Sequence, residues 1–352
     1  MSGRASGGQE LVRPAVLMGG SVGRPATTIG SVGRPATTTA AALVIALLAA
    51  SLGYAADADA TKAAAVADAG AAAGAFDKWL DAVYATPDEQ ELRADAYIPR
   101  GAGPFPGVLV VHGGAWMSGH RSHMARISSQ LARHGYSAVS ISYRLAPQYK
   151  WPAQIEDCRS ALCWMHTHTD RLKIDPASVG ALGYSAGGQL VAMLGVTETP
   201  LALAAQRPAN AERDGAAGAK EVLRLKAVVA GGAPCDFRWL PRDSSALTFW
   251  LGGTRAEKPE VYDQASPAKF VSADDPPILF YHGDGDTVVP IQSPTAMAAS
   301  LRAAGVSAEL HKVKGGHIEA FFSDEGLNAA IEFLDKNLKP ASDAPGTTEN
   351  AE

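Results

Sequence analysis

A serine lies between two glycines in the sequence G-Y-S-A-G-G, where the serine is Ser185. The apolar run 179–182 precedes this motif and a small-residue helical start at 187–194 follows it, a pattern that predicts a strand, a sharp turn and a helix. Glycines at 183 and 187 would let the backbone fold back without a side-chain clash. Ser185 would then stand at the tip of the turn with its hydroxyl exposed, which is typical of a nucleophile in acyl transfer.

Acyl transfer through a serine also needs backbone N–H groups that stabilise the negatively charged oxygen of the tetrahedral intermediate. The sequence H-G-G-A-W follows the apolar run 107–111 and predicts such a loop at the end of a strand. We expect the N–H groups of Gly114 and Ala115 to serve as donors, with Gly113 as a further candidate. The N–H of Ala186, the residue after the serine, would supply the other half. An ordinary glycine turn is the alternative interpretation.

An acid and a histidine are needed to activate a serine, and both follow predicted strands. Asp284 and Asp286 come after the apolar run 278–281, and His317 comes after the run 308–313. Either acid alone is also compatible with a turn cap, and the histidine with a solvent-exposed helix start. The chain order of serine, acid and histidine differs from the orders in chymotrypsin and subtilisin.

With these motifs the chain resembles the α/β-hydrolase esterases, in particular the hormone-sensitive-lipase-like and the feruloyl- and acetyl-esterase-like carboxylesterases. The resemblance runs from about residue 83 to residue 338 and rests on nine segments: 83–86, 112–116, 143–147, 151–153, 156–157, 183–188, 266–267, 282–290 and 316–317. It implies a Ser185–His317–Asp286 triad, with Asp286 rather than Asp284 as the acid. Ala115 departs from the glycine common at its position, but its N–H is retained. The serine motif and the H-G-x-x-D pattern also occur in prolyl-oligopeptidase-like peptidases.

Alternating apolar runs and helical patterns predict an α/β fold with a mainly parallel eight-stranded sheet flanked by helices. The expected strands are 80–85, 91–98, 107–112, 137–143, 179–184, 226–232, 278–282 and 308–313. The expected helices are 121–134, 153–168, 187–195, 293–304 and 318–337. Two long connections, 197–220 and 237–271, interrupt the pattern.

The connection 237–271 is interpreted as a small partial cap over the site. It carries Trp239 and Trp250, which with Trp116 and Tyr184 are candidate residues of a substrate pocket. The alternative is that these aromatic side chains only pack the cap onto the core.

The composition of the 352-residue chain suits one large catalytic domain, which we place at 76–339. The net charge of −5 comes from interspersed acids and bases, so no basic surface for nucleic acid is expected. The three cysteines, Cys158, Cys163 and Cys235, are read as buried thiols without disulfides. No metal-binding spacing is found among the histidines, and the proposed chemistry needs no cofactor.

The N-terminal region predicts export. An apolar run at 40–52 follows four arginines and precedes small residues, which is typical of a signal peptide cleaved near Ala55. Residues 1–55 would therefore be a signal peptide with a repeat-containing leader, and translation starts at Met1 or at Met18. An uncleaved anchor is the alternative. Residues 56–75 are read as an alanine-rich linker and 340–352 as a disordered tail.

Together these features predict a secreted or periplasmic serine carboxylesterase for short acyl or aryl-acyl esters, including acetyl or feruloyl esters of plant polysaccharide. The expected partner is a small-molecule or polysaccharide-linked ester, with no nucleic acid and no stable membrane span after processing. The alternatives are a prolyl-oligopeptidase-like peptidase, an amide hydrolase, and a non-catalytic binding protein on the same fold. The sequence leaves the natural ester, the acyl length and the oligomeric state open.

Overall fold

The computed structural model describes residues 74–200 and 222–339. The predicted leader and signal peptide, most of the predicted linker and the predicted C-terminal tail lie outside these ranges. Within them, no helix has both the length and the apolar character needed to cross a membrane.

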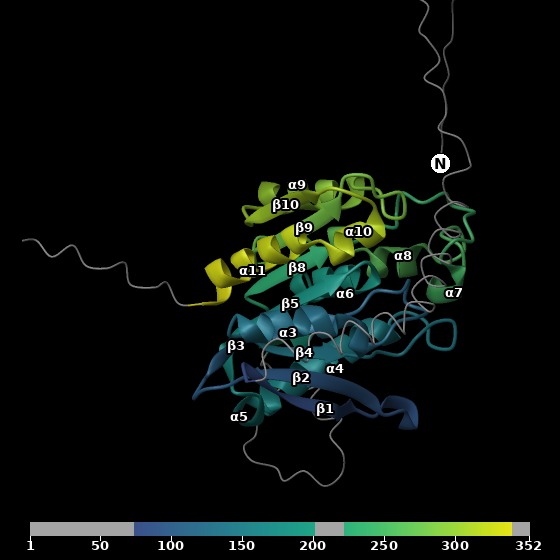
Figure 1. Cartoon of the computed structure of the whole chain (residues 1–352). Coiled ribbons are helices and arrows are strands. Elements are labelled where there is room, and N and C mark those ends of the chain that lie inside the picture. Colours follow the sequence, from purple (N-terminus) through teal and green to yellow (C-terminus); the bar gives the residue numbers. More distant parts are fainter. Residues whose placement is uncertain (1–73, 201–221, 340–352) are drawn as a thin grey trace, which may run out of the picture. The chain divides into compact units, whose positions relative to one another are not determined.

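One large sheet forms the centre of the described part (Figure 1). Its strands are β1 (Phe76–Ala85), β2 (Leu92–Pro99), β3 (Phe105–Val111), β4 (Ser137–Ile141), β5 (Ile174–Tyr184), β8 (Ala227–Gly231), β9 (Ile278–Gly283) and β10 (Ala308–Val313). They lie in the order β1-β2-β4-β3-β5-β8-β9-β10. The two short strands β6 (Thr199–Pro200) and β7 (Val222–Leu223) pair separately.

Most neighbouring strands in the large sheet are parallel. Only β2 runs antiparallel to its neighbours, β1 and β4, whereas the pairs from β4 through β3, β5, β8 and β9 to β10 are parallel. The predicted eight-stranded, mainly parallel sheet is confirmed. Parallel strands place all their carboxyl ends at one edge, and this edge carries the candidate site.

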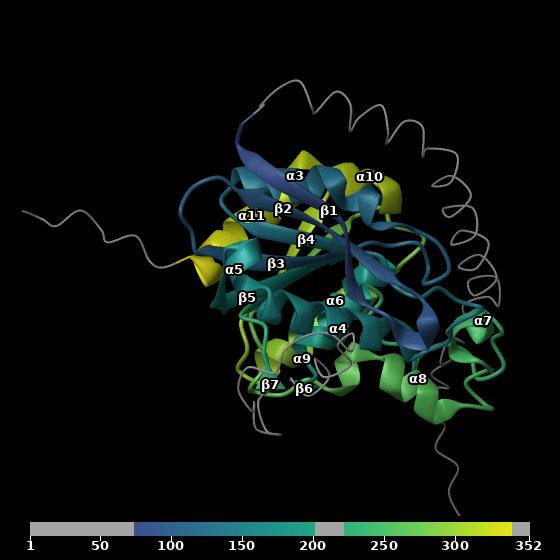
Figure 2. The ribbon, with the colours of Figure 1, turned by 90° about the horizontal axis from the view of Figure 1, so that it is seen from below.

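Helices cover both faces of the sheet (Figure 2). The helices are α3 (Ala125–Arg133), α4 (Ala153–Thr167), α5 (Thr169–Leu172), α6 (Ala186–Gly195), α7 (Thr248–Leu251), α8 (Pro259–Ala265), α9 (Gln292–Ala303), α10 (His317–Phe322) and α11 (Asp324–Leu338), with 3₁₀ turns at η1 (Pro87–Glu89), η2 (Arg121–Met124) and η4 (Pro267–Lys269). Helices α3, α10 and α11 lie on one face, and α4, α6 and α9 lie on the other.

The side chains of the central strands explain why both faces are covered. In β3, Val108 and Val110 pack into the core beneath α3 and α11, whereas Leu109 and Val111 pack into the core beneath α4 and α6. Successive side chains of a strand point to opposite faces, so a continuously apolar strand must be buried on both sides.

The single helix predicted over 318–337 is wrong, because the chain forms two helices there. Ser323 has extended backbone angles, φ −65° and ψ 123°, and separates α10 from α11. Its hydroxyl accepts a hydrogen bond from the N–H of Gly326 at 3.1 Å, so it caps α11. Serine competes for backbone hydrogen bonds and favours helix starts over helix interiors.

The connection 237–271 folds into short pieces, namely α7, α8 and η4, rather than into one long helix. It is tied to the rest of the domain by backbone hydrogen bonds from Trp151 N to Trp250 O at 3.0 Å and from Ala268 N to Cys235 O at 3.0 Å. The three cysteines are buried and form no disulfide within the described residues.

Candidate active site

Four loops meet at the carboxyl edge of the parallel strands. The segment 112–119 follows β3, Ser185 follows β5, the segment 284–290 follows β9, and the segment 314–317 follows β10. The sequence places these loops up to about 200 residues apart, and the parallel sheet brings them to one place.

The turn at Ser185 is tight, and the glycines at 183 and 187 allow the backbone to adopt it. Ser185 itself has φ 56° and ψ −118°, a region that residues with a side chain seldom adopt. A Cβ atom at Gly183 would lie 2.2 Å from Gly187 O, and a Cβ atom at Gly187 would lie 2.2 Å from Val111 O. Any larger residue at either position would therefore disrupt the strand–turn–helix geometry.

A chain of hydrogen bonds links the serine, the histidine and one acid. His317 Nε2 lies 2.9 Å from Ser185 Oγ, and His317 Nδ1 lies 2.6 Å from Asp286 Oδ2. All three side chains are buried or nearly so. Tyr184 donates its hydroxyl to His317 O at 2.6 Å, which fixes the backbone of the histidine from the side of the sheet.

The geometry distinguishes Asp286 from Asp284. Asp286 Oδ1 accepts hydrogen bonds from the N–H groups of Val288 and Val289 at 2.8 and 2.9 Å. The other oxygen, Oδ2, faces His317. Asp284 is exposed and accepts only the N–H of Gly315, at 3.1 Å, among the described residues. Asp286 is thus the acid that reaches His317.

A second histidine, His282, also contacts Asp286. No function was assigned to it from the sequence. Its Nε2 lies 3.1 Å from Asp286 Oδ2 and donates to Val289 O at 2.8 Å. Burial by itself would raise the pKa of the Asp286 carboxyl, but the hydrogen bonds from His282 and His317 outweigh burial and hold this pKa well below its usual range. Asp286 therefore stays ionised. The H-G-x-x-D spacing, which puts His282 four residues before the acid, is the signal in the sequence.

The 113–115 loop approaches the serine closely. A Cβ atom at Gly113 would lie 3.1 Å from the Cβ of Ser185, and one at Gly114 would lie 2.3 Å from Ser118 O. Within the described residues, the N–H groups of Gly113, Gly114, Ala115 and Ala186 donate to no acceptor. Unpaired N–H groups in a loop that approaches a serine suit a site for a negatively charged oxygen.

His112 packs against this loop and holds it in place. It is buried, its ring stacks on Tyr143 with centroids 4.3 Å apart, and its Nδ1 donates to Gly113 O at 2.7 Å. Burial lowers the pKa of His112 to about 3, so the imidazole is neutral at ordinary pH. Its contacts give it a structural role in the loop.

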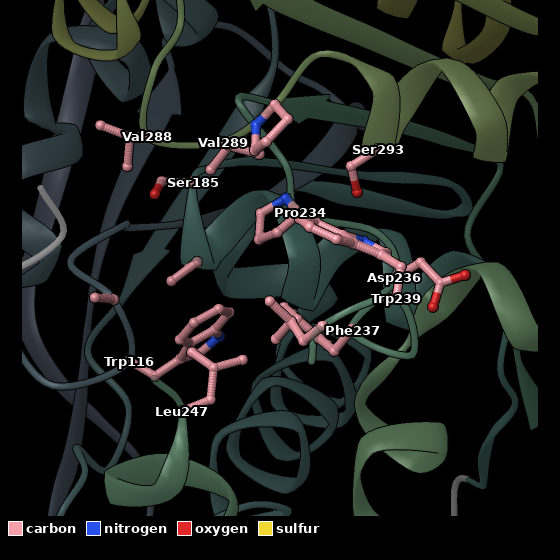
Figure 3. A pocket seen from close by; sticks show the side chains of 14 residues that line it. Trp116, Ser185, Pro234, Asp236, Phe237, Trp239, Leu247, Val288, Val289 and Ser293 are labelled. Carbon is pink, nitrogen blue, oxygen red and sulfur yellow. The ribbon is translucent and has the colours of Figure 1, made fainter. Parts of the chain in front are cut away.

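A cavity of about 480 Å³, including its opening to solvent, lies beside Ser185 (Figure 3). Its walls come from the 113–116 loop, the start of α6, the 234–247 segment and the 288–293 segment. The lining residues are Ala115, Trp116, Ser185, Ala186, Pro234, Asp236, Phe237, Trp239, Leu240, Leu247, Val288, Val289, Pro290 and Ser293. The cavity is largely apolar, which suits a site for a small apolar group.

Two of the four predicted pocket residues line this cavity and two do not. Trp116 and Trp239 form part of the wall, and Trp239 is 54% exposed. The expectation for Tyr184 and Trp250 needs correction. Tyr184 lies beneath His317, and Trp250 is fully buried behind Trp116, with the two indole rings stacked 3.7 Å apart.

Cys235, near this cavity, is not a second nucleophile. It is fully buried, and burial raises the pKa of its thiol, so it stays protonated.

The sheet, its helices and the serine turn at the carboxyl edge define an α/β-hydrolase fold. More than half of the chain, residues 94–301, matches the BD-FAE family model, and the chain belongs to this family.

Several known proteins similar to this chain are esterases by name. Esterase LipC of Mycobacterium tuberculosis is 31% identical over 207 residues, which are 57% of this chain and 49% of LipC. The solved structure of a truncated form of a carbohydrate esterase from gut microbiota superposes with a TM-score of 0.65 at 26% identity, covering 76% of this chain and 99% of that one. The esterase Est2 of Thermogutta terrifontis shares the fold, with a TM-score of 0.60 at 22% identity over 77% of this chain and 95% of Est2.

The matched region spans about half the length of the curated relatives, with 49%, 46% and 47% of the first three covered.

Proposed function

We propose that this protein is a serine carboxylesterase. The observation that carries the proposal is the hydrogen-bonded series from Ser185 through His317 to Asp286, at 2.9 and 2.6 Å. The names of its relatives, which include esterases and a carboxylic ester hydrolase, support the same activity.

The reaction begins when Ser185 Oγ attacks the carbonyl carbon of the ester. His317 Nε2 takes the serine proton, and Asp286 stabilises the resulting imidazolium. The carbonyl oxygen becomes negatively charged and accepts hydrogen bonds from the N–H groups of Ala186 and the 113–115 loop.

The tetrahedral intermediate then collapses. The bond between the carbonyl carbon and the alcohol oxygen breaks, and His317 gives its proton to the leaving alcohol. A water molecule loses a proton to His317 as it attacks the acyl-enzyme. The second tetrahedral intermediate releases the carboxylic acid, and the proton on His317 returns to Ser185 Oγ.

The cavity favours short or flat acyl groups. It is lined by Ser185 and by the backbone donors Ala115 and Ala186, but His317, which protonates the alcohol, is not among the described residues that line it. The cavity is therefore assigned to the acyl group, and the alcohol to the side of His317. The volume of about 480 Å³ includes the opening to solvent, and its lining comes from four short segments, so we expect little apolar surface for a long chain, in which each buried CH₂ contributes about 0.8 kcal/mol. Acetyl or feruloyl esters of plant polysaccharide are among the substrates we propose, and the gut carbohydrate esterase supports that class.

Labelling tests the nucleophile. A fluorophosphonate should modify the wild-type protein once, and Ser185→Ala should remove both labelling and hydrolysis. Asp243→Ala, a change in the exposed part of the 237–271 segment, is a control that should leave both intact. Labelling that persists in Ser185→Ala would exclude Ser185.

Two substrate series test the class of substrate. p-Nitrophenyl esters should be hydrolysed much faster than an aminoacyl anilide, which a peptidase would prefer. Within the acetate, butyrate, octanoate and palmitate esters, kcat/KM should peak at about four to six carbons or fewer, because longer chains find no further apolar wall. A steady rise to palmitate would show that the acyl site is long and that the enzyme is a lipase.

A further inference from the structure

The proposed oxyanion loop contains two residues in an unfavourable backbone conformation. Ala115 and Trp116 have φ angles of 53° and 60°, in the left-handed region that residues with a Cβ rarely adopt. Such conformations persist only where the surroundings hold them. The contacts of Trp116 therefore decide whether the Ala115 N–H stays beside Ser185.

Trp116 is held in three ways. Its ring is stacked on Trp250, with an angle of 4° between the ring planes. Its carbonyl oxygen accepts the N–H of Ala146 at 2.9 Å. Its indole N–H donates to Gln189 Oε1 at 3.0 Å, inside the protein, where an unpaired N–H would be costly.

Gln189 connects this indole to two other parts of the site. It lies on α6, one helical turn after the nucleophile, and its backbone N–H donates to Ser185 O at 3.0 Å. Its Nε2 donates to Ala265 O at 2.8 Å, at the end of α8 in the 237–271 connection. The side chain is fully buried, so both of its hydrogen bonds are made away from water.

We propose that Gln189 is a positioning residue for the oxyanion site: it fixes Trp116, and through Trp116 the Ala115 N–H, relative to Ser185 and to the 237–271 connection. This inference rests on the proposed esterase function. Gln189 touches no substrate and acts through the loop. Displacement of the connection at Ala265 would reach the oxyanion donors through the hydrogen bonds of this side chain.

A second buried glutamine provides a matched control. Gln154 Oε1 accepts the indole N–H of Trp250 at 3.0 Å, and Gln154 Nε2 donates to two backbone carbonyls, Arg144 O and Tyr149 O. Like Gln189, it bonds an indole N–H and backbone carbonyls. Its indole partner is Trp250, however, which lies one ring further from the oxyanion loop than Trp116. Gln189→Met removes two side-chain hydrogen bonds and Gln154→Met removes three, each with little change in side-chain volume.

The experiment measures kcat and KM of both variants on p-nitrophenyl acetate, together with inhibition by phenylboronic acid, which forms a tetrahedral adduct on the serine. Since removal of one oxyanion donor costs about 10²–10³ in rate, a displaced donor should lower kcat in Gln189→Met by about 10- to 100-fold. KM should stay within about twofold, and the boronic acid should bind correspondingly more weakly. Gln154→Met should keep kcat within about threefold.

A double-mutant cycle of Gln189→Met and Trp116→Phe tests whether Gln189 acts through the indole N–H of Trp116. This variant retains an aromatic ring and removes the N–H donor. If Gln189 acts through that donor, Trp116→Phe should lower kcat similarly, and the double variant should lose little more. Additive losses would overturn the proposal, as would equal losses in Gln189→Met and Gln154→Met or an unchanged kcat in Gln189→Met.

Failure of the proposed function gives a different result. Absence of ester hydrolysis and of Ser185 labelling in the wild-type protein would reject the esterase itself and, with it, any oxyanion role for Gln189. Normal activity and labelling in both the wild-type protein and Gln189→Met would reject only the positioning role.

Discussion

At the scale of the residue, the contacts of the two acids on the 284–290 loop separate their roles. They lie only two positions apart on one loop, yet their carboxylates have different partners. Asp286 turns inward, where two backbone N–H groups and two histidines surround its carboxylate. Asp284 stays in solvent.

Substitution of each acid should reveal this difference. Asp286→Asn should lower kcat on the order of 10⁴-fold, because a neutral amide no longer stabilises the imidazolium or selects the correct tautomer of His317. Asp284→Asn, at an exposed site, should change kcat by about twofold or less. Steady-state kinetics on p-nitrophenyl acetate measures both, and the opposite ranking would place the acid at Asp284.

At the scale of the element, short helices and loops are held by single polar contacts that hydrophobic patterning does not report. The Ser323 cap divides α10 from α11, and a buried ion pair joins the loop after β4 to α4. In that pair Arg144 Nη2 lies 2.8 Å from Asp157 Oδ1, and the Asp157 side chain is 1% exposed.

Loss of the α11 cap should cost stability without affecting catalysis. Ser323→Ala leaves the Gly326 N–H without its partner and should lower the free energy of unfolding by about 1 kcal/mol. Urea denaturation followed by circular dichroism would measure this change. Ser300→Ala, on the exposed side of α9, is the control and should change stability by less than about 0.5 kcal/mol. An equal effect of the two variants would contradict the capping role.

Removal of Arg144 should be far more costly. Arg144→Met leaves the buried carboxylate of Asp157 without its cation and should lower the free energy of unfolding by about 3–5 kcal/mol. Arg100→Met, which breaks the exposed pair of Arg100 with Asp77, should cost less than about 1 kcal/mol. The double variant Arg144→Met with Asp157→Leu should recover much of the loss, because no unpaired charge remains. A double variant as unstable as Arg144→Met alone would show that the ion pair is not the cause.

At the scale of the whole molecule, the mainly parallel sheet gathers the site. Ser185 and His317 are 132 positions apart in the chain, yet their side chains are hydrogen-bonded, because β5 and β10 end at the same edge. The matched family model covers most of this arrangement, but ends at residue 301, before His317.

Export is a proposal for the whole chain, carried by the basic leader and the apolar run at 40–52. N-terminal sequencing of protein recovered from the periplasm or the medium should find a first residue close to position 56. Ile45→Arg should block export and leave the protein inside the cell, because a charge interrupts the apolar segment. An intact Met1 or Met18 on the mature protein would contradict processing near Ala55.

The sequence by itself determined the main strands and most helices, because apolar periodicity reports burial directly. It also determined the serine turn, because Gly183 and Gly187 are positions where no Cβ fits. The H-G-x-x-D spacing already favoured Asp286 over Asp284. Only the tertiary structure moved Trp250 from the pocket wall to the layer behind Trp116 and linked Gln189 to Trp116 across 73 positions. These outcomes depend on the directions of side chains from distant segments, and a local pattern of residue types does not contain those directions.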